Sequence, residues 1–192
     1  ARLADLARGV MRRKTDRLQE AFVGRVTEHH VYLLTKMLAR VDQIDADIAD
    51  LDTRIEEQIS PFRSLVDRLD QIPGIAPVAA AVIIAEIGTD MTRFPTAGHL
   101  CSWAGFAPLA RESAKRSKPR STGRGDRYLA RVLGDAVAGA GRTPTFLGAR
   151  YRRLARRRGK NKATVAVARS MLTIIWHLMN DPEARFHELG QD

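Results

Sequence analysis

Apolar residues recur every three or four positions along most of this chain, which is the spacing that places them on one face of an α-helix. No stretch alternates apolar and polar residues as a half-buried strand does. Near the amino terminus, the apolar residues with this helical spacing are Leu3, Leu6, Val10, Leu18, Phe22 and Val26. A break in the helix is expected near Gly9. The pattern therefore predicts an all-α protein.

From residue 34 onward the spacing becomes a heptad repeat. One seam position holds Leu34, Val41, Ile48, Ile55 and Phe62, and the other holds Met37, Ile44, Leu51 and Leu65. β-branched residues at the first seam position favour a two-stranded parallel coiled coil. We therefore expect residues 1–62 to form an elongated arm that joins copies of the chain into a homo-oligomer. The alternative is an antiparallel helical hairpin, in which residues 14–30 pack on residues 34–58 of the same chain.

Residues 63–192 are expected to form a compact helical domain. Near its start, Pro73 and Gly74 separate two apolar helical stretches. A glycine in this position is typical of a helix-hairpin-helix element, whose turn presents backbone N–H groups to a DNA phosphate. Gly74 and Ile75 would make that contact. The alternative is an ordinary pair of helices packed in the core.

The remaining helices are predicted from their capping residues. Thr96 is expected to cap a short helix that carries Trp103, which we interpret as a core anchor. The next helix would begin at Gly125-Asp126, and a further one at Thr143-Pro144, with proline in its first position. Gly159 would end that helix, and a last, buried helix would span residues 163–179.

The charge balance indicates an anionic partner, because 32 Lys+Arg against 22 Asp+Glu give a formal charge of +10. Between residues 111 and 127 the basic residues are opposed only by Glu112 and Asp126. A segment of nearly one sign of charge needs solvent or phosphate around it. The predicted nucleic-acid contacts there are Arg111, Lys115, Arg116, Lys118, Arg120, Arg124 and Arg127. A second basic patch, from the helix before Gly159, consists of Arg156, Arg157 and Arg158.

Several classes of protein are excluded by composition. Cys101 is the single cysteine, and the five histidines have no zinc-ligand spacing. We therefore expect neither a disulfide framework nor a metal site in these residues. No apolar run reaches the length of about 18 residues that a membrane span needs, and the basic amino terminus does not resemble a signal peptide. These features predict a cytoplasmic protein with no membrane contact.

An ordered set of short motifs extends from residue 72 to residue 160. The motifs are Ile72-Pro73-Gly74-Ile75, Ala85-Glu86-Ile87-Gly88, Arg93-Phe94-Pro95-Thr96, Trp103-Ala104-Gly105-Phe106-Ala107-Pro108, Glu112-Ser113-Ala114, Gly125-Asp126-Arg127-Tyr128-Leu129, Tyr151-Arg152-Arg153-Leu154 and Arg157-Arg158-Gly159-Lys160. In this order they resemble the carboxy-terminal domain of the IS110 family of bacterial insertion-sequence transposases. The arm is similar to the coiled coil that precedes that domain in the family.

The resemblance implies a DNA recombinase of a mobile element, with a serine nucleophile that falls by position on Ser113. In the family, a separate RuvC-like domain binds divalent metal, expected to be Mg²⁺, through four acidic residues. That domain is not within these residues, so this chain alone is expected to be inactive. The partners implied are DNA at element ends and targets, a structured guide RNA encoded by the element, and further copies of the transposase.

Three interpretations remain open from the sequence. Ser113 attacks a DNA phosphodiester once the acidic domain is supplied, or it is an ordinary polar residue in a non-catalytic nucleic-acid-binding and oligomerisation module. The third is a purely structural helical protein whose charge is incidental. A serine hydroxyl needs a base or a metal near neutral pH, and the phosphate that it attacks needs cationic groups around it. Arg111, Lys115 and Arg116 would supply that charge.

Overall fold

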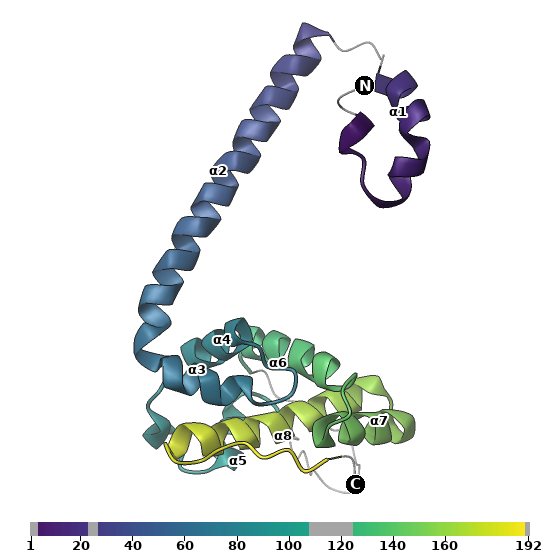
Figure 1. The fold of residues 1–192 in the computed structure, drawn as a ribbon. Coiled ribbons are helices and arrows are strands. Elements are labelled where there is room, and N and C mark those ends of the chain that lie inside the picture. The colour runs from purple at the N-terminus through teal and green to yellow at the C-terminus, as the bar shows by residue number, and fades with distance from the viewer. Residues whose placement is uncertain (1–3, 23–26, 108–124, 191–192) are drawn as a thin grey trace, which may run out of the picture. The chain divides into compact units, whose positions relative to one another are not determined.

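The computed structural model describes residues 4–22, 27–107 and 125–190 (Figure 1). These ranges contain α-helices and short 3-10 helices and no strand, which confirms the all-α prediction for the described part of the chain. Internal contacts divide the protein into two compact units, Ala1–Gln58 and Ile59–Asp192. The sequence pattern placed the boundary four residues later, after Phe62.

The amino-terminal unit contains two short 3-10 helices, Ala4–Leu6 and Gly9–Lys14, followed by α1 (Thr15–Phe22) and α2 (Glu28–Ile59). The predicted break lies at Gly9, which adopts a positive φ of 58°. α2 is continuous over 32 residues, and its side chains from Glu28 to Gln58 are all exposed. Because the seam residues such as Val41 and Ile48 are uncovered, the hairpin alternative is not formed among the described residues. The coiled coil between copies stays a prediction.

The second unit begins where Pro61 interrupts the long helix. A 3-10 turn, Ser60–Phe62, leads into α3 (Arg63–Asp70), which buries Leu65, Val66 and Leu69. A turn containing Gly74 then leads into α4 (Pro77–Ile87). After a further 3-10 turn, Met91–Arg93, the domain continues with α5 (Ala97–Trp103), α6 (Arg127–Ala140), α7 (Phe146–Arg158) and α8 (Lys160–Asn180).

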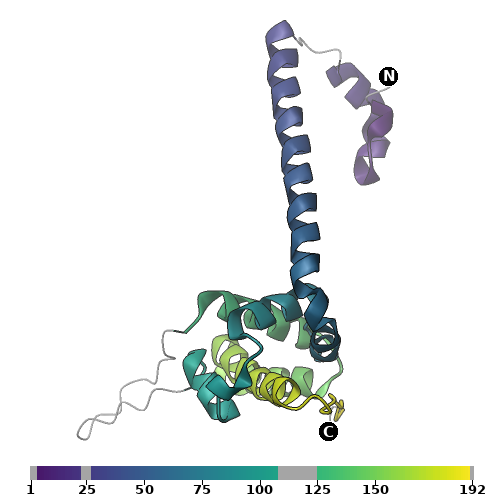
Figure 2. The ribbon, with the colours of Figure 1, turned by 90° about the vertical axis from the view of Figure 1, so that its left-hand side faces the viewer.

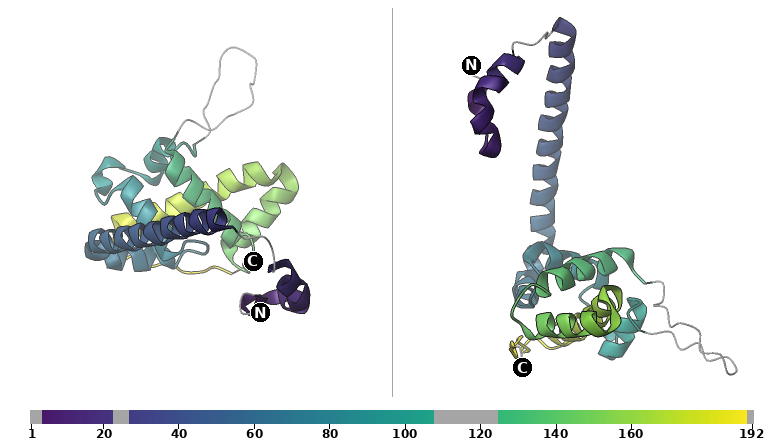
Figure 3. Two further views of the ribbon diagram at one scale, coloured as in Figure 1. Left: turned by 90° about the horizontal axis from the view of Figure 1, so that it is seen from above. Right: turned by 90° about the vertical axis from the view of Figure 1, so that its right-hand side faces the viewer.

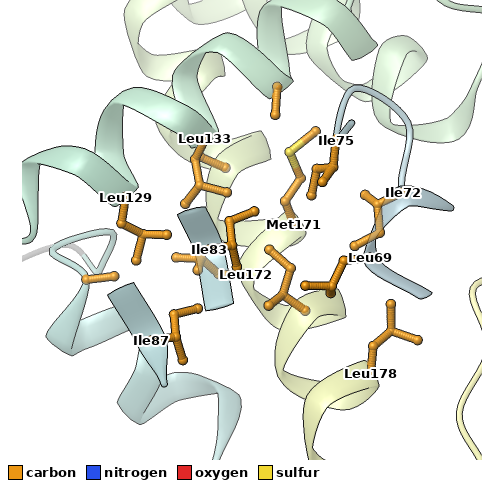
Figure 4. Close-up of a cluster of buried hydrophobic side chains, with 14 of the residues drawn as sticks. Leu69, Ile72, Ile75, Ile83, Ile87, Leu129, Leu133, Met171, Leu172 and Leu178 are labelled. Carbon is orange, nitrogen blue, oxygen red and sulfur yellow. The ribbon is translucent and has the colours of Figure 1, made fainter. Parts of the chain in front are cut away.

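The core of this domain is built around α8, which packs against α3, α5, α6 and α7 (Figures 1 and 3). Met171, Leu172 and Ile175 of α8 are fully buried. Figure 4 shows Met171 and Leu172 among apolar side chains from α3, α4 and α6, including Leu69, Ile83 and Leu133. Burial of a side chain of this size contributes about 1.5–3 kcal/mol, so these residues make α8 a large contributor to the stability of this domain.

Local capping predictions have mixed outcomes. The Thr96 hydroxyl accepts from the His99 amide at the start of α5, which confirms this cap. The helix start predicted at Gly125-Asp126 is confirmed as well, and the Asp126 carboxylate caps it by accepting from the Leu129 amide. The predicted cap at Thr143 is wrong. Thr143 closes the end of α6 by donating its hydroxyl to the Ala140 carbonyl, and Thr145 caps α7 instead.

The prediction that Trp103 anchors the core is also wrong. Trp103 ends α5 with 39% of its surface exposed, and its ring lies tilted against Phe94 with 5.3 Å between centroids. The more buried indole belongs to Trp176 of α8, whose ring N–H donates to the Phe94 carbonyl at 2.8 Å. The buried residues of α5 are Leu100 and Cys101, whereas Trp103 is its last residue and lies at the surface.

Candidate functional site

The predicted site residues that the structure describes lie in the turn before α4, at the start of α6 and at the end of α7. α4 and α6 lie side by side in the domain (Figure 2). Gly74 contacts the backbone of Ala136 and Ala140 near the end of α6, whereas Gly125 lies just before its start. At 1.5 Å of rise per residue, these two points are about 15–20 Å apart along the helix. The hairpin and the ends of the basic segment therefore form two separate surfaces.

The hairpin glycine serves packing. Gly74 has a φ of 92°, and a Cβ at this position would lie 2.1 Å from the Ala136 carbonyl oxygen. Ile75 is buried, and its amide donates to the Ile72 carbonyl at 3.0 Å. Among the two predicted phosphate contacts, only Gly74 is on the exposed side of the turn. Phosphate binding by this hairpin stays a prediction, while the contact with α6 gives the turn a clear structural role.

Gly125 holds the two ends of the basic segment together. A Cβ on Gly125 would lie 2.1 Å from the Ala104 carbonyl oxygen and 2.7 Å from the Gly105 nitrogen, so the chain after residue 124 touches the chain before residue 108. We call this contact between Gly125 and Ala104–Gly105 the loop base. Ser113 lies outside the described residues, as do Arg111, Lys115, Arg116, Lys118, Arg120 and Arg124.

Two carboxyl groups meet beside the loop base. Asp126 caps α6 by accepting from the Leu129 amide at 2.7 Å. Glu86, near the end of α4, faces this cap, and burial together with the charge and hydrogen bond of Asp126 raises the pKa of Glu86. Nothing in the sequence pattern indicated this pair, because 40 positions separate its two members.

Glu86→Gln is expected to raise the thermal midpoint of unfolding at pH 7. The folded protein disfavours the ionised Glu86, so this carboxyl lowers stability at pH values above its ordinary pKa, and the neutral amide removes the repulsion with Asp126. The gain should shrink as the pH falls below about 4, because Glu86 then becomes protonated in both states. Thermal unfolding followed by circular dichroism at both pH values measures the change in the midpoint.

The matched control for this substitution is Asp135→Asn, which neutralises an exposed carboxylate on α6. Substitutions at such surface positions change stability by no more than about 0.5 kcal/mol. A lower midpoint for Glu86→Gln than for the unchanged protein at pH 7 would contradict the proposed repulsion.

Arg127 is the one predicted nucleic-acid contact of the basic segment that lies within the described residues. It is exposed in the first turn of α6. Its Nη2 donates to the Tyr128 hydroxyl at 2.7 Å, and its guanidinium carbon lies 4.7 Å from the centroid of the Tyr128 ring. The side chain is therefore held at the surface, with donors still available for a phosphate.

The second basic patch lies where α7 ends and α8 begins. Arg156, Arg157 and Arg158 are all exposed, and residues 142–180 contain no aspartate or glutamate. Sequence reasoning missed Lys160 and Lys162, which extend the exposed patch into the first turn of α8. The absence of acidic residues over this range would have indicated them. Arg152 has a structural role instead, since its Nη1 donates to the Gly141 and Thr143 carbonyls.

Metal and thiol chemistry have no support in the described ranges. Within them, no three side chains of His, Cys, Asp or Glu are grouped so that they could hold a metal ion. Cys101 is buried, and burial raises the pKa of its thiol, so it is not an activated nucleophile. Among the described helices, none is both long and apolar enough to cross a membrane.

Residues 66–152, which run from α3 into α7, match the family model described as the transposase IS116/IS110/IS902 family. The chain belongs to this family of transposases. The match includes Gly74, both sides of the loop base and Ser113, and it confirms the family that the ordered motifs predicted.

Individual relatives of the family support the assignment. The chain is 30% identical over 155 residues to the insertion element IS900 uncharacterized 42 kDa protein of Mycobacterium paratuberculosis, covering 78% of this chain and 38% of the relative. It is 26% identical over 192 residues to the insertion element IS110 uncharacterized 43.6 kDa protein of Streptomyces coelicolor, covering 94% and 47%. The pilin gene-inverting protein of Moraxella bovis is 30% identical over 151 residues, covering 73% and 47%. The chain thus spans less than half the length of these relatives.

Proposed function

We propose that this chain is the DNA-binding and serine-bearing part of an insertion-sequence transposase, which is a DNA recombinase. The family match over residues 66–152 carries the proposal, because it includes the segment that holds Ser113. The name of one relative, the pilin gene-inverting protein, describes a rearrangement of DNA. An exposed basic surface on α7 and α8 and a formal charge of +10 agree with a polyanionic substrate.

In the proposed reaction the Ser113 hydroxyl attacks a DNA phosphodiester. The bond between the Ser113 oxygen and phosphorus forms as the bond between phosphorus and one deoxyribose oxygen breaks. The serine hydroxyl gives up its proton, the deoxyribose oxygen takes up a proton and leaves as a free hydroxyl, and the protein becomes covalently joined to the other DNA end. Positive groups near the attacked phosphate would stabilise its added negative charge, and the basic segment 111–127 supplies them. Divalent metal belongs to the acidic domain that the family resemblance implies. The described residues do not fit a metal site, so no step of this chain is assigned to a metal.

The loop base supports this proposal, because it fixes where the serine-bearing segment is attached to the domain. Gly125 contacts Ala104 and Gly105, so described residues on the two sides of the gap at 108–124 lie next to each other. The Asp126 cap fixes the start of α6 there. We propose that this anchoring delivers the serine segment to DNA from one edge of a rigid helical domain.

The test is a recombination assay with the complete transposase, element-end DNA and target DNA. We expect strand-transfer products, and a protein–DNA adduct that survives denaturation and disappears on protease digestion. Recombination without any such adduct would overturn the serine mechanism. An absence of both products and nucleic-acid binding would overturn the proposed function.

A second candidate is a non-catalytic module that binds nucleic acid and oligomerises. The observation in its favour is the exposed apolar seam of α2, where Val41, Ile48 and Ile55 are each at least half exposed. A seam of this kind is the usual surface of a coiled coil. Under this candidate the chain forms oligomers in sedimentation experiments and no covalent adduct with DNA is ever detected. A structured guide RNA remains a proposed partner in both cases.

Changing Arg116, Lys118 and Arg120 together to glutamine should weaken DNA binding and flatten its salt dependence. Each lost phosphate contact is expected to reduce the slope of log K against log salt by about 0.9. Fluorescence anisotropy at several salt concentrations measures the slope. The control changes Arg13, Arg17 and Arg40 of the exposed arm, which removes the same charge. Equal slopes for both variants would show that the basic segment makes no specific phosphate contacts.

A further inference from the structure

Two aromatic side chains are exposed beside the loop base. Trp103 has 39% of its surface exposed and Tyr128 has 53%. Trp103 directly precedes Ala104, and Tyr128 follows Gly125 by three residues, so each lies close to the contact that joins Gly125 to Ala104. We call Trp103 and Tyr128 the aromatic pair. Their exposure beside one shared contact makes this edge of the domain a candidate binding surface.

Both rings are supported from within the domain. The Trp103 indole leans on the buried Phe94, with 5.3 Å between the ring centroids, and the Arg93 guanidinium lies 5.6 Å from the Phe94 ring. Arg127 lies 4.7 Å from the centroid of the Tyr128 ring and donates to its hydroxyl. The rings are therefore held in place before anything binds, and ordering them costs little. No hydrogen bond from the Trp103 ring N–H is found among the described residues.

The chemistry of this surface fits an unpaired nucleobase. A base stacks on an aromatic face, while a neighbouring arginine contacts its phosphate, and this combination is typical of proteins that bind single strands. Base pairs within a duplex have both faces covered by their neighbours, so an intact duplex offers no ring to stack. The exposed Arg127 lies beside Tyr128, and the sequence from residue 111 to residue 127 is strongly basic, which favours an anionic strand over an apolar protein partner.

We propose that Trp103 and Tyr128 stack unpaired bases of the nucleic acid that the transposase handles. The inference rests on the proposed function, because it names the surface that holds a strand once that strand is unpaired. Unpaired DNA at a junction and unpaired RNA of a guide share this chemistry. The experiment below separates the two sources.

The first test uses the intrinsic fluorescence of Trp103. The chain has two tryptophans, so Trp176→Phe leaves Trp103 as its single indole. Single-stranded DNA and RNA oligonucleotides should quench this fluorescence, whereas an abasic strand of equal length and a blunt duplex should not. Anisotropy of labelled strands measures total binding independently. Quenching by DNA alone or by RNA alone identifies the source of the unpaired base, and either result supports stacking.

The second test measures affinity in the otherwise unchanged chain, and it holds even where Trp176→Phe fails to fold. Trp103→Ala should weaken binding of a single strand by about tenfold, the loss typical of one stacked base. Trp103→Phe should retain most of the affinity, and Tyr128→Ala should behave like Trp103→Ala. The abasic strand should bind equally to all variants. Val78→Ala is the matched control, because Val78 is 77% exposed on α4, toward the other end of α6.

The outcomes separate this inference from the function on which it rests. Strong binding of single strands with neither quenching nor an effect of Trp103→Ala overturns the stacking proposal and leaves the proposed function intact. Equal quenching by the abasic strand also overturns it, since phosphate contact alone would then explain the signal. An absence of binding to every nucleic acid at moderate salt overturns both.

Discussion

Ser113→Ala in the complete transposase is expected to abolish strand transfer, with a loss of more than about a thousandfold. Removing a nucleophile eliminates the covalent intermediate and leaves only the contributions of binding and charge stabilisation. Affinity for DNA should stay nearly unchanged, because the substitution removes one hydroxyl and no charge. Strand-transfer products resolved on a denaturing gel, together with anisotropy titrations, measure the two effects separately.

Ser117→Ala is the matched control, since Ser117 lies in the same basic segment four residues further along. We expect it to retain recombination. Ser113→Cys gives a further readout, because a thiol nucleophile would form an adduct of different chemical stability. Normal recombination by Ser113→Ala would remove this residue from the mechanism and favour the non-catalytic module.

Gly74→Ala is expected to destabilise the second unit by about 3 kcal/mol or more. The backbone of Gly74 has a φ of 92°, and the added Cβ would lie 2.1 Å from the Ala136 carbonyl oxygen and 2.9 Å from the Ala140 nitrogen. These are backbone atoms of α6, so relief requires a shift of the whole hairpin. Urea unfolding followed by circular dichroism measures the loss.

Gly134→Ala provides the control within α6. Nothing lies within 4 Å of a Cβ at Gly134, and alanine is the better helix former, so a gain of roughly 0.5–1 kcal/mol is expected. A Gly74→Ala protein as stable as the unchanged one would contradict the close packing of the hairpin on α6. Because the predicted loss comes from packing, it should be the same with and without DNA.

The sequence by itself determined those features that depend on neighbouring residues. Helical periodicity identified an all-α chain and the long α2, because side chains three and four positions apart share one helix face. The caps at Thr96 and Asp126 were predictable, since each hydroxyl or carboxylate reaches an amide only three residues away. Ordered motifs identified the family, although Ser113 itself lies outside the described residues.

Only the tertiary structure decided which distant segments meet. The contact of Gly74 with α6 could not be predicted from the sequence, nor could the exposure of Trp103 and the deeper burial of Trp176. The Glu86 and Asp126 pair and the contact of Gly125 with Ala104 likewise join parts of the chain that are far apart in sequence. Periodicity reports which face of a helix is apolar, but not which partner covers it. For that physical reason, the surface beside the loop base emerged only once the helices were packed.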